Sequence, residues 1–582
     1  MRKLTVCGCD ISAFTIVIPT IPDPAEKNAA EFLQRVIAAS CGVTLPVSDT
    51  KTDHSIVLGA RETDPQIKWD GFRIVSDENH LYLHGNMARG TLYAAYSFAE
   101  RYLGYRYFAS DCIAIPTDGE GEVPANLNII DTPGFEVRRT TCHTHVRSAE
   151  YAAHARLNDC MPTGDEYGNG VGLTGECHTF CRYISPDEYY DEHPEYFALR
   201  NGKRMGWDED HCPAQLCLTN PDVLRIVTEK ALQRLRENPD MKVLELSQND
   251  NEEYCTCEHC AAIDAEEGSQ SGTMIRFINA VAKAVEKEFP DVLIRTFAYW
   301  YTRIPPKHTK ARHNVLVRYC TMHACCRHAI DDPTCARNYD HYYKEMHEWQ
   351  TKCDQMSIWD YITCWRSYIP PFPNLVSLRE NMRFFAECGA VHVLEECNAD
   401  SAAGGTTPEL KAYLAALLLW NPYMSLEEYR THIDEFLAAF YGPGWKHIRQ
   451  YMELEYETTA HRHPGCMDLV DTGRYSYGDY YPKPYQEIIP DNTLSDLASR
   501  YDEAMALITK AKEMAETEEQ RYHIDGIRLS LKYMEITCVK HDKAKMSPEE
   551  QAFHEADVIE FEKEKTARKW RYNTSTAAHQ GR

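Results

Sequence analysis

Carboxylate side chains gather at three places where an apolar run of the sequence ends. Asp250 comes shortly after VLEL, Asp360 lies in MSIWDYI, and Glu395 and Glu396 end VHVLEE. Hydrolysis of a glycosidic bond requires two such groups: a protonated acid that donates to the leaving oxygen, and a charged carboxylate that stabilises positive character at the sugar carbon. We therefore predict that Asp250, Glu395 and Glu396 are catalytic.

Polar and aromatic residues accompany these acids at the ends of the runs. Candidates for binding a sugar are His178, Tyr299, Trp300, Trp359 and Asp360. Aromatic rings offer flat faces for a pyranose, and rings around an acid would raise its pKa by desolvation. Each residue also has a structural interpretation: the acids could cap helices or pair with arginine, and the rings could pack in the core.

Three thiols follow Asp250 within ten residues. Cys255, Cys257 and Cys260 form CxCxxC, which is compact enough to bind Zn²⁺, a metal that takes four nitrogen or sulfur ligands. Candidates for the fourth ligand, in the stretch HACCRHAIDDPTC, are Cys325, Cys326 and Cys335. The three thiols are candidates for a structural zinc site that would hold the acid-bearing loop, and we expect no cofactor for catalysis itself. The alternative is a set of buried free thiols.

The acids must be positioned by the apolar runs that precede them. These runs read as buried strands, and helical patterns separate most of them. The runs are residues 243–246, 292–300, 315–320, 356–362 and 391–396. Such alternation predicts a doubly wound sheet or a (β/α)8 barrel, and the length of about 300 residues favours the TIM barrel. Barrel enzymes carry their catalytic groups on the loops after the strands, where these acids lie.

The chain divides into three predicted regions. Residues 1–130 read as a small α/β domain, residues 131–440 as the barrel, and residues 441–582 as a helical C-terminal region. Within the first region, the pattern predicts a helix that ends at Gly42 and a hairpin of strands at 71–77 and 80–86.

Composition excludes several partners. The chain has 62 basic and 88 acidic residues, a formal charge of −26, which argues against nucleic acid or an anionic membrane as a partner. No stretch of 18 apolar residues predicts a membrane span. The N-terminus lacks a signal-peptide pattern, and the 23 cysteines are an odd number, so we expect a cytoplasmic protein with reduced thiols.

Several stretches resemble known families. ARGTLYAAYSFAERYLGYRYF resembles the end of the small domain that precedes the barrel in β-hexosaminidases and α-glucuronidases. Five further stretches resemble the successive signatures of the domain-of-unknown-function family 4838: EHPEYFAL, QLCLTNPDV, LSQNDNEEYCTCEHC, IWDYITCW and LEECNADSAAGGTTPELKAYLAALLLWNP. The resemblance runs from about residue 25 to 440. Part of that family is classed as glycoside hydrolase family 163, endo-β-N-acetylglucosaminidases acting on complex N-glycans.

The resemblance implies a barrel glycosidase for glycans or oligosaccharides that contain N-acetylglucosamine. It also implies substrate-assisted retention, in which the 2-acetamido oxygen attacks, one carboxylate orients it and a neighbouring acid protonates the leaving group. The positions carried over by motif are Asp250 in QND and Glu395-Glu396 in LEEC. Two alternatives stay open: a non-catalytic carbohydrate-binding protein, and a Zn-dependent hydrolase that uses the Cys/His cluster.

Overall fold

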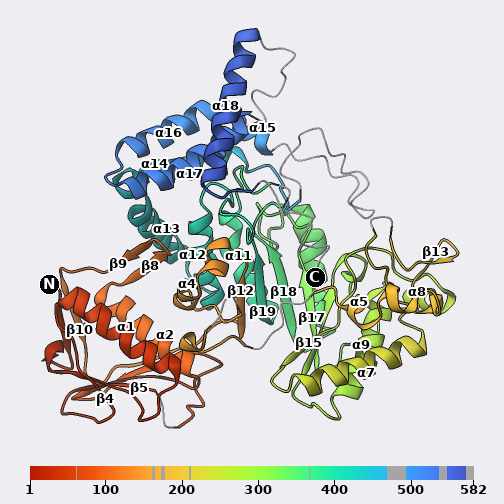
Figure 1. Cartoon of the computed structure of the whole chain (residues 1–582), viewed down its shortest axis with the longest axis horizontal. Coiled ribbons are helices and arrows are strands. Elements are labelled where there is room, and N and C mark those ends of the chain that lie inside the picture. The colour runs from red at the N-terminus through yellow and green to blue at the C-terminus, as the bar shows by residue number, and fades with distance from the viewer. Residues whose placement is uncertain are drawn as a thin grey trace.

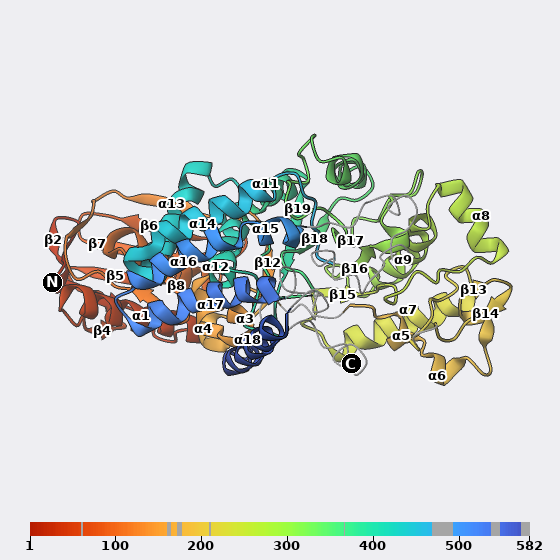
Figure 2. The same ribbon diagram turned by 90° about the horizontal axis from the view of Figure 1, so that it is seen from above.

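The protein, seen here in a computed structural model, consists of three packed parts (Figure 1). The structure describes residues 1–59, 62–159, 164–171, 177–208, 211–365, 367–467, 493–536 and 547–571. A parallel sheet lies between the N-terminal part and a group of helices that includes α7 (Pro221–Glu237), α8 (Glu258–Glu267) and α9 (Ser271–Val285). These two groups lie at opposite ends of the molecule when it is viewed from above (Figure 2).

The N-terminal part is an α/β domain, as the sequence predicts. Its main sheet has the strand order β11-β6-β7-β5-β3-β4, and β6 and β7 form the expected antiparallel hairpin. The strands are β3 (Thr15–Val17), β4 (Val47–Ser48), β5 (Ser55–Leu58), β6 (Phe72–Ser76), β7 (His80–Gly85) and β11 (Asn128–Asp131). A second, smaller sheet joins β1 (Lys3–Val6), β2 (Cys9–Asp10) and β10 (Glu120–Val123).

Helices α1 (Pro24–Cys41) and α2 (Ala88–Phe98) pack against each other and against this domain's main sheet. Helix α1 has the local chemistry that fixes both of its ends. The Asp23 side chain accepts a hydrogen bond from the backbone N–H of Ala25, and the Glu26 carboxylate accepts one from the backbone N–H of Asp23. Gly42 ends the helix with φ of 77°, a left-handed conformation that glycine adopts without strain.

The central sheet is parallel and curled. Its strand order is β12-β19-β18-β17-β16-β15, and every neighbouring pair is parallel. The strands are β12 (Val137–Thr140), β15 (Val243–Glu245), β16 (Leu293–Ala298), β17 (Val315–Cys320), β18 (Met356–Tyr361) and β19 (Ala390–Glu396). The five strands predicted from the sequence are therefore confirmed to within two residues at each end.

The complete (β/α)8 barrel is not present in the described residues. The first strand, β12, pairs with the last, β19, as happens when a barrel closes, but β12 and β15 remain at the two edges of a six-stranded sheet. The chain between these edges includes residues 160–163, 172–176 and 209–210, which lie outside the described ranges. The described part of the chain forms a curled parallel sheet. A closed barrel of eight strands stays a prediction.

Helices alternate with these strands. Helix α9 connects β15 to β16, α10 (Lys344–Trp349) precedes β18, α11 (Leu375–Glu387) connects β18 to β19, and α12 (Pro408–Trp420) follows β19. Among the helices of the described chain, none is long and apolar enough to cross a membrane.

Most of the C-terminal helices share one hydrophobic core with the sheet and its helices. The helices that do so are α13 (Leu426–Tyr441), α14 (Trp445–Thr458), α15 (Thr493–Ala498), α16 (Tyr501–Glu513) and α17 (Glu518–Met534). The same cluster of buried side chains contains Leu378 of α11, Leu414 of α12, Ile448 of α14 and Ile527 of α17. The last helix, α18 (Pro548–Ala567), packs through a separate small cluster in which its Phe561 joins Leu529 of α17. The helical region is thus packed into the body of the protein instead of forming a detached module.

A buried arginine joins the N-terminal domain to the central sheet. Arg138 of β12 is fully buried, and its Nη1 and Nη2 donate to the two carboxylate oxygens of Asp70 at 3.0 and 2.7 Å. Its Nε donates to the carbonyl of Arg156, and the Asn158 amide also donates to Asp70. The guanidinium carbon lies 5.0 Å from the centroid of the Trp420 ring. Every charge at this joint therefore has a partner, which is the condition for burying it.

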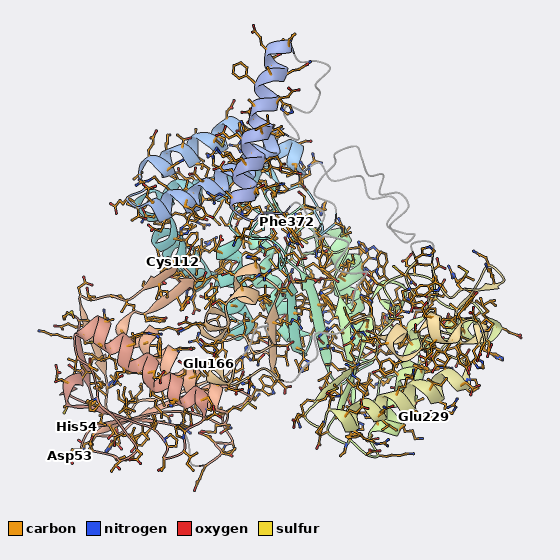
Figure 3. All side chains as sticks on the ribbon, viewed as in Figure 1. Asp53, His54, Cys112, Glu166, Glu229 and Phe372 are labelled. Carbon is orange, nitrogen blue, oxygen red and sulfur yellow. The ribbon has the colours of Figure 1, made fainter. Side chains whose placement is uncertain are left out.

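A hairpin connects the N-terminal domain with the C-terminal helices. Its strands β8 (Arg106–Ala109) and β9 (Cys112–Ala114) contact α13, and Figure 3 shows Cys112 at this junction. In the turn, Asp111 Oδ2 lies 3.0 Å from Nε2 of His523 on α17. The His523 ring stacks on Phe440 with centroids 3.6 Å apart. This hairpin brings all three parts into contact.

Replacement of the buried acid at the domain joint is predicted to destabilise the protein. Asp70→Ala leaves Arg138 buried without its carboxylate, and we expect the free energy of unfolding to fall by about 3–5 kcal/mol. The matched control is Glu120→Ala, because Glu120 pairs with Lys3 through side chains that are both 79% exposed. That change should cost less than about 1 kcal/mol. Urea unfolding measures both, and equal shifts of the midpoint would contradict the role given to Arg138.

Candidate functional site

A pocket of about 220 Å³ lies at the carboxyl ends of the parallel strands. All of these strands end in the same direction, so the residues that follow them meet at one rim. The lining residues are Arg139, Thr141, Cys177, His178, Asp250, Phe297, Tyr299, Arg318, Cys320, Met322, Trp359, Tyr361, Trp365, Leu394 and Glu396. Of the three predicted catalytic residues, Asp250 and Glu396 share this pocket.

Glu396 is a partly buried acid at the last position of β19. Its Oε2 accepts a hydrogen bond of 2.6 Å from Nε1 of Trp359. Burial raises the pKa of Glu396 to about 8, a change that the Trp359 hydrogen bond and the charge of Arg139 oppose and the negative charge of Asp250 reinforces. The group is therefore protonated at neutral pH, which is the state a proton donor needs.

Asp250 differs from Glu396 because its side chain is 60% exposed. The Tyr299 hydroxyl donates to Asp250 Oδ1 at 3.1 Å, and burial together with the Asp250 charge holds the pKa of that phenol well above its ordinary value. His178 Nε2 lies 3.8 Å from the same oxygen, while its Nδ1 donates to the Gln248 carbonyl at 2.9 Å. The carboxylate is accessible from the pocket and held by a hydroxyl donor.

The loop that carries Asp250 is fixed by buried amide side chains. Gln248 Nε2 donates to the Tyr299 carbonyl at 2.8 Å, and its Oε1 accepts from the Thr302 hydroxyl at 2.7 Å. Asn249 Nδ2 donates to the Ala214 carbonyl at 2.8 Å. Because these groups are buried, losing a partner would cost about 1–3 kcal/mol each, which keeps the loop in one conformation.

The structure corrects the prediction that Glu395 and Asp360 belong to the site. Neighbouring side chains on a strand point to opposite faces, so Trp359, Tyr361 and Glu396 line the pocket while the two residues between them do not. Asp360 and Glu395 are direct register partners on β18 and β19. Both are buried on the other face of the sheet, where Asp360 accepts a hydrogen bond from Thr321.

Burial shifts the pKa of both acids on the opposite face of the sheet. It raises the pKa of Asp360 to about 6, and burial together with the Asp360 charge raises the pKa of Glu395 well above its ordinary value. Within the described chain, neither carboxyl oxygen of Glu395 has a hydrogen-bond partner. A neutral Glu395 avoids the cost of an unpaired buried charge.

Trp300 also lies outside the pocket lining. Its backbone is left-handed, with φ of 52°, and its ring packs edge-to-face on His323 with centroids 5.0 Å apart. The other predicted sugar-binding residues, His178, Tyr299 and Trp359, do line the pocket. The aromatic surface is completed by Phe297, Tyr361 and Trp365. Tyr361 could have been found from the sequence, because it lies two positions after Trp359 and therefore on the same face.

Two arginines line the pocket and were not predicted as site residues. Arg318 is 6% exposed, its Nε donates to the Ser357 hydroxyl at 3.3 Å, and its guanidinium lies 5.3 Å from the Trp359 ring. Arg139 Nη1 is 3.4 Å from an Asp159 oxygen. Burial lowers the pKa of Arg318 to about 10, so it keeps its charge at neutral pH. The pocket thus offers positive charge beside the acids.

A larger hollow of about 1120 Å³ lies between the N-terminal domain and helices α12 and α13. Of the five acids that line it, three have an arginine partner: Glu100 with Arg156, Asp131 with Arg101, and Glu435 with Arg106. The other two, Glu427 and Glu428, are exposed on the first turn of α13. The arginine partners occupy three of these carboxylates, and among the described residues that line the hollow the two exposed ones have no buried acid beside them. The smaller pocket, with its protonated and exposed acids, is the better candidate for chemistry.

The predicted thiol cluster has a different fourth member. Cys255, Cys257 and Cys260 are joined by Cys217, and the four buried sulfur atoms lie within 4.8 Å of one another. The expectation that Cys325, Cys326 or Cys335 would complete the set is wrong. Cys217 comes instead from QLCLTNPDV, and its sulfur is 3.7 Å from that of Cys257.

Hydrogen-bond donors surround these sulfur atoms. The backbone N–H of Leu199 lies 3.3 Å from Cys255 Sγ, and Arg204 Nη1 lies 3.8 Å from the same atom. The Thr219 hydroxyl is 3.2 Å from Cys260 Sγ. Donors of this kind stabilise thiolates, which are the form that binds metal.

Comparison with known proteins identifies a family and a similar fold. The sequence profile of the family described as Domain of unknown function (DUF4838) matches residues 107–453. A family GH115 4-O-methyl-α-glucuronidase with specificity for decorated arabinogalactans is similar in structure, with a TM-score of 0.60 and 13% identity over 96% of this chain and 77% of that chain. At this identity the likeness shows the fold alone. No curated protein matches the sequence.

Two further solved structures give weaker matches. A GH138 enzyme targeting pectin rhamnogalacturonan II has a TM-score of 0.44 and 12% identity over 95% of this chain and 73% of that chain. A Streptomyces plicatus β-hexosaminidase in complex with GlcNAc has a TM-score of 0.41 and 12% identity over 75% of this chain and 90% of that chain. Both scores are too low to support an argument about the fold.

The raised pKa of Glu396 predicts a pH-dependent cost to stability. Between the ordinary pKa of a glutamate, about 4.3, and the folded value of about 8, the unfolded chain releases this proton and the folded chain keeps it. Stability attributable to Glu396 is therefore lost as the pH rises through this window. Glu396→Gln cannot ionise, so its free energy of unfolding should rise relative to that of the natural protein as the pH increases from about 5 to about 8, by at most about 1.4 kcal/mol per pH unit.

Thermal unfolding at a series of pH values measures this difference in stability between Glu396→Gln and the natural protein. Glu348→Gln, a change at an exposed surface position, serves as the control and should give a difference that does not vary with pH. A constant difference for Glu396→Gln would show that this carboxyl group is not held protonated.

Proposed function

The chain belongs to the domain-of-unknown-function family DUF4838, and we propose that it is a glycoside hydrolase. One observation carries the proposal: a single pocket holds Glu396, with a pKa raised to about 8, and Asp250, an exposed carboxylate. An acid kept neutral beside one kept charged is the pair that glycosidic cleavage requires. Aromatic rings at the same rim and the fold similarity to a GH115 glucuronidase support it.

In the proposed mechanism, Glu396 donates its proton to the glycosidic oxygen as the bond from that oxygen to the anomeric carbon breaks. Trp359 holds the Glu396 carboxyl group in place and Tyr299 holds Asp250. The Asp250 charge stabilises the positive character that develops on the sugar, or orients the 2-acetamido group if the substrate itself attacks. Water then adds to the anomeric carbon, and its proton returns to Glu396.

The alternatives from other classes are less well supported. A protein that only binds a sugar gains nothing from a carboxyl group kept protonated at neutral pH, because a charged one accepts stronger hydrogen bonds from hydroxyl groups. A zinc hydrolase needs an open coordination position for water. The cluster of Cys217, Cys255, Cys257 and Cys260 offers four buried sulfur ligands and no such position. We propose that this cluster binds a structural Zn²⁺.

Two sugar classes are candidates for the substrate. The relation to glycoside hydrolase family 163 that the motifs suggest favours glycans that contain N-acetylglucosamine. Arg139 and Arg318 favour a second class, uronides, because a guanidinium group binds the planar carboxylate of a uronic acid through two parallel hydrogen bonds. Either class fits the proposed pair of acids.

Substitution of the acids is predicted to lower activity when the acid faces the pocket and to leave it unchanged when the acid lies on the opposite face of the sheet. Glu396→Gln should lower kcat by about 100- to 10,000-fold, the usual contribution of a general acid. The loss should shrink for aryl glycosides with very acidic leaving groups, which need no proton, and the decline of activity above pH 8 should disappear. Asp250→Asn should lower kcat for all leaving groups.

Glu395→Gln is the matched control, one position away and of the same chemistry. Because Glu395 is buried on the opposite face and held neutral, the isosteric amide should leave kcat close to that of the natural protein. Steady-state kinetics on aryl glycosides measures all three variants. Full activity in Glu396→Gln, or loss only in Glu395→Gln, would contradict the proposed assignment.

The substrate class can be tested with Arg318→Met, which keeps the apolar stem and removes the charge. For a uronide, kcat/KM should fall about 10- to 100-fold, because a charge-assisted hydrogen bond contributes about 1.5–3 kcal/mol. For an N-acetylglucosaminide, kcat/KM should change little. Parallel assays of aryl β-glucuronide, aryl N-acetyl-β-glucosaminide and an N-glycan identify the class, and turnover of none of these would count against both.

A further inference from the structure

A second cluster of potential metal ligands lies where the loop after β17 meets the segment that follows α14. It consists of Cys325, His328, Cys335 and His463, whose ligand atoms all lie within 4.8 Å of one another. Cys325 Sγ is 3.3 Å from His328 Nδ1, and Cys335 Sγ is 3.4 Å from His463 Nδ1. Both cysteines are buried and both histidines are half-buried.

We propose that this cluster binds one Zn²⁺ through two thiolates and two imidazoles. Zinc sites of this composition are tetrahedral, with bonds of about 2.3 Å to sulfur and about 2.0 Å to nitrogen, so neighbouring ligand atoms lie about 3.3–3.8 Å apart. The two sulfur-to-nitrogen distances of 3.3 and 3.4 Å fit this spacing. Two thiolates also balance the charge of the ion, which permits its burial.

The surroundings orient the ligands as a metal site requires. His328 Nε2 lies 3.0 Å from the Ala460 carbonyl, which only accepts, so this nitrogen carries the proton and Nδ1 presents its lone pair to the cluster. Asn338 accepts from the backbone N–H of Cys325 at 2.7 Å and donates to the carbonyls of Cys325 and His328 at 2.9 Å. The turn that carries two of the ligands is therefore closed by one buried amide.

The fourth ligand is fixed by a different set of contacts. Arg337 Nη1 donates to the His463 carbonyl at 2.7 Å, and its Nε donates to the His323 carbonyl at 2.7 Å. The backbone N–H of Cys326 donates to the Pro464 carbonyl at 2.7 Å. These bonds join the loop after β17 to the segment 463–467, although more than 120 residues separate them in the chain.

The proposed ion would hold one wall of the catalytic pocket. Three residues after His463, the sulfur of Cys466 donates to the Met322 carbonyl at 2.7 Å, and the Cys466 carbonyl accepts from the backbone N–H of Trp365. Met322 and Trp365 both line the pocket. The zinc would cross-link the loop after β17 to the segment that supports these two side chains, and its role is structural because its four ligands leave no position for substrate.

Metal analysis of the purified full-length protein tests the proposal. Together with the zinc of the Cys217 cluster, we expect two zinc ions per chain. Cys335→Ser and His463→Ala should each lose one ion and keep the other, and His463→Cys should keep both because thiolate can replace imidazole. Co²⁺ loaded in place of zinc into a Cys257→Ser variant should give the visible absorption bands of a tetrahedral site with two sulfur ligands.

The matched controls change residues of the same kind that lie outside both clusters. His461→Ala alters an exposed histidine two positions from His463, and Cys353→Ser alters a half-buried thiol that donates to the Trp349 carbonyl. Both should keep two zinc ions. The proposal is overturned if the natural protein holds a single zinc that Cys257→Ser removes and Cys335→Ser does not, or if Cys325 and Cys335 are found oxidised to a disulfide.

Discussion

The alternation of side chains across a β-strand decides which charges of this protein meet. Glu395 and Glu396 are neighbours in the chain, yet one faces the packed side of the sheet and the other faces the pocket. On β18 the same alternation places Trp359 and Tyr361 in the pocket and Asp360 behind it, in register with Glu395. Two acids that look equivalent in the sequence therefore have different environments and different chemistry.

Differences in burial give the acids different pKa values and therefore different proposed roles. A buried carboxyl group without a cationic partner keeps its proton to higher pH than an exposed one, because an unpaired charge in the interior is costly. Glu396 follows this rule while remaining accessible, whereas Asp250 stays in contact with solvent. At the joint between the N-terminal domain and the central sheet, a buried charge is kept instead by pairing: the Arg138 guanidinium donates to both carboxylate oxygens of Asp70.

Local patterns predicted the elements well because their causes are local. The strand positions follow from apolar runs, and the ends of α1 follow from Asp23 and Gly42. The pocket was predicted in part: the strand-end rule found Asp250, Glu396 and Tyr299 but could not tell which neighbour faced inward without the register. Arg138 with Asp70, Cys217 in the first thiol cluster and His463 in the second depend on contacts between distant segments, which no local spacing encodes.

The segment 463–467 has a consequence for how the protein is made. Its contacts with Met322 and Trp365 join residues separated by about a hundred positions or more, and the segment lies after all six parallel strands in the chain. A ribosome releases the strands and both early cysteines of the second cluster well before His463 emerges. During synthesis the sheet can therefore assemble while one side of its rim stays unfinished, so a nascent chain completes this pocket only after residue 467 has emerged.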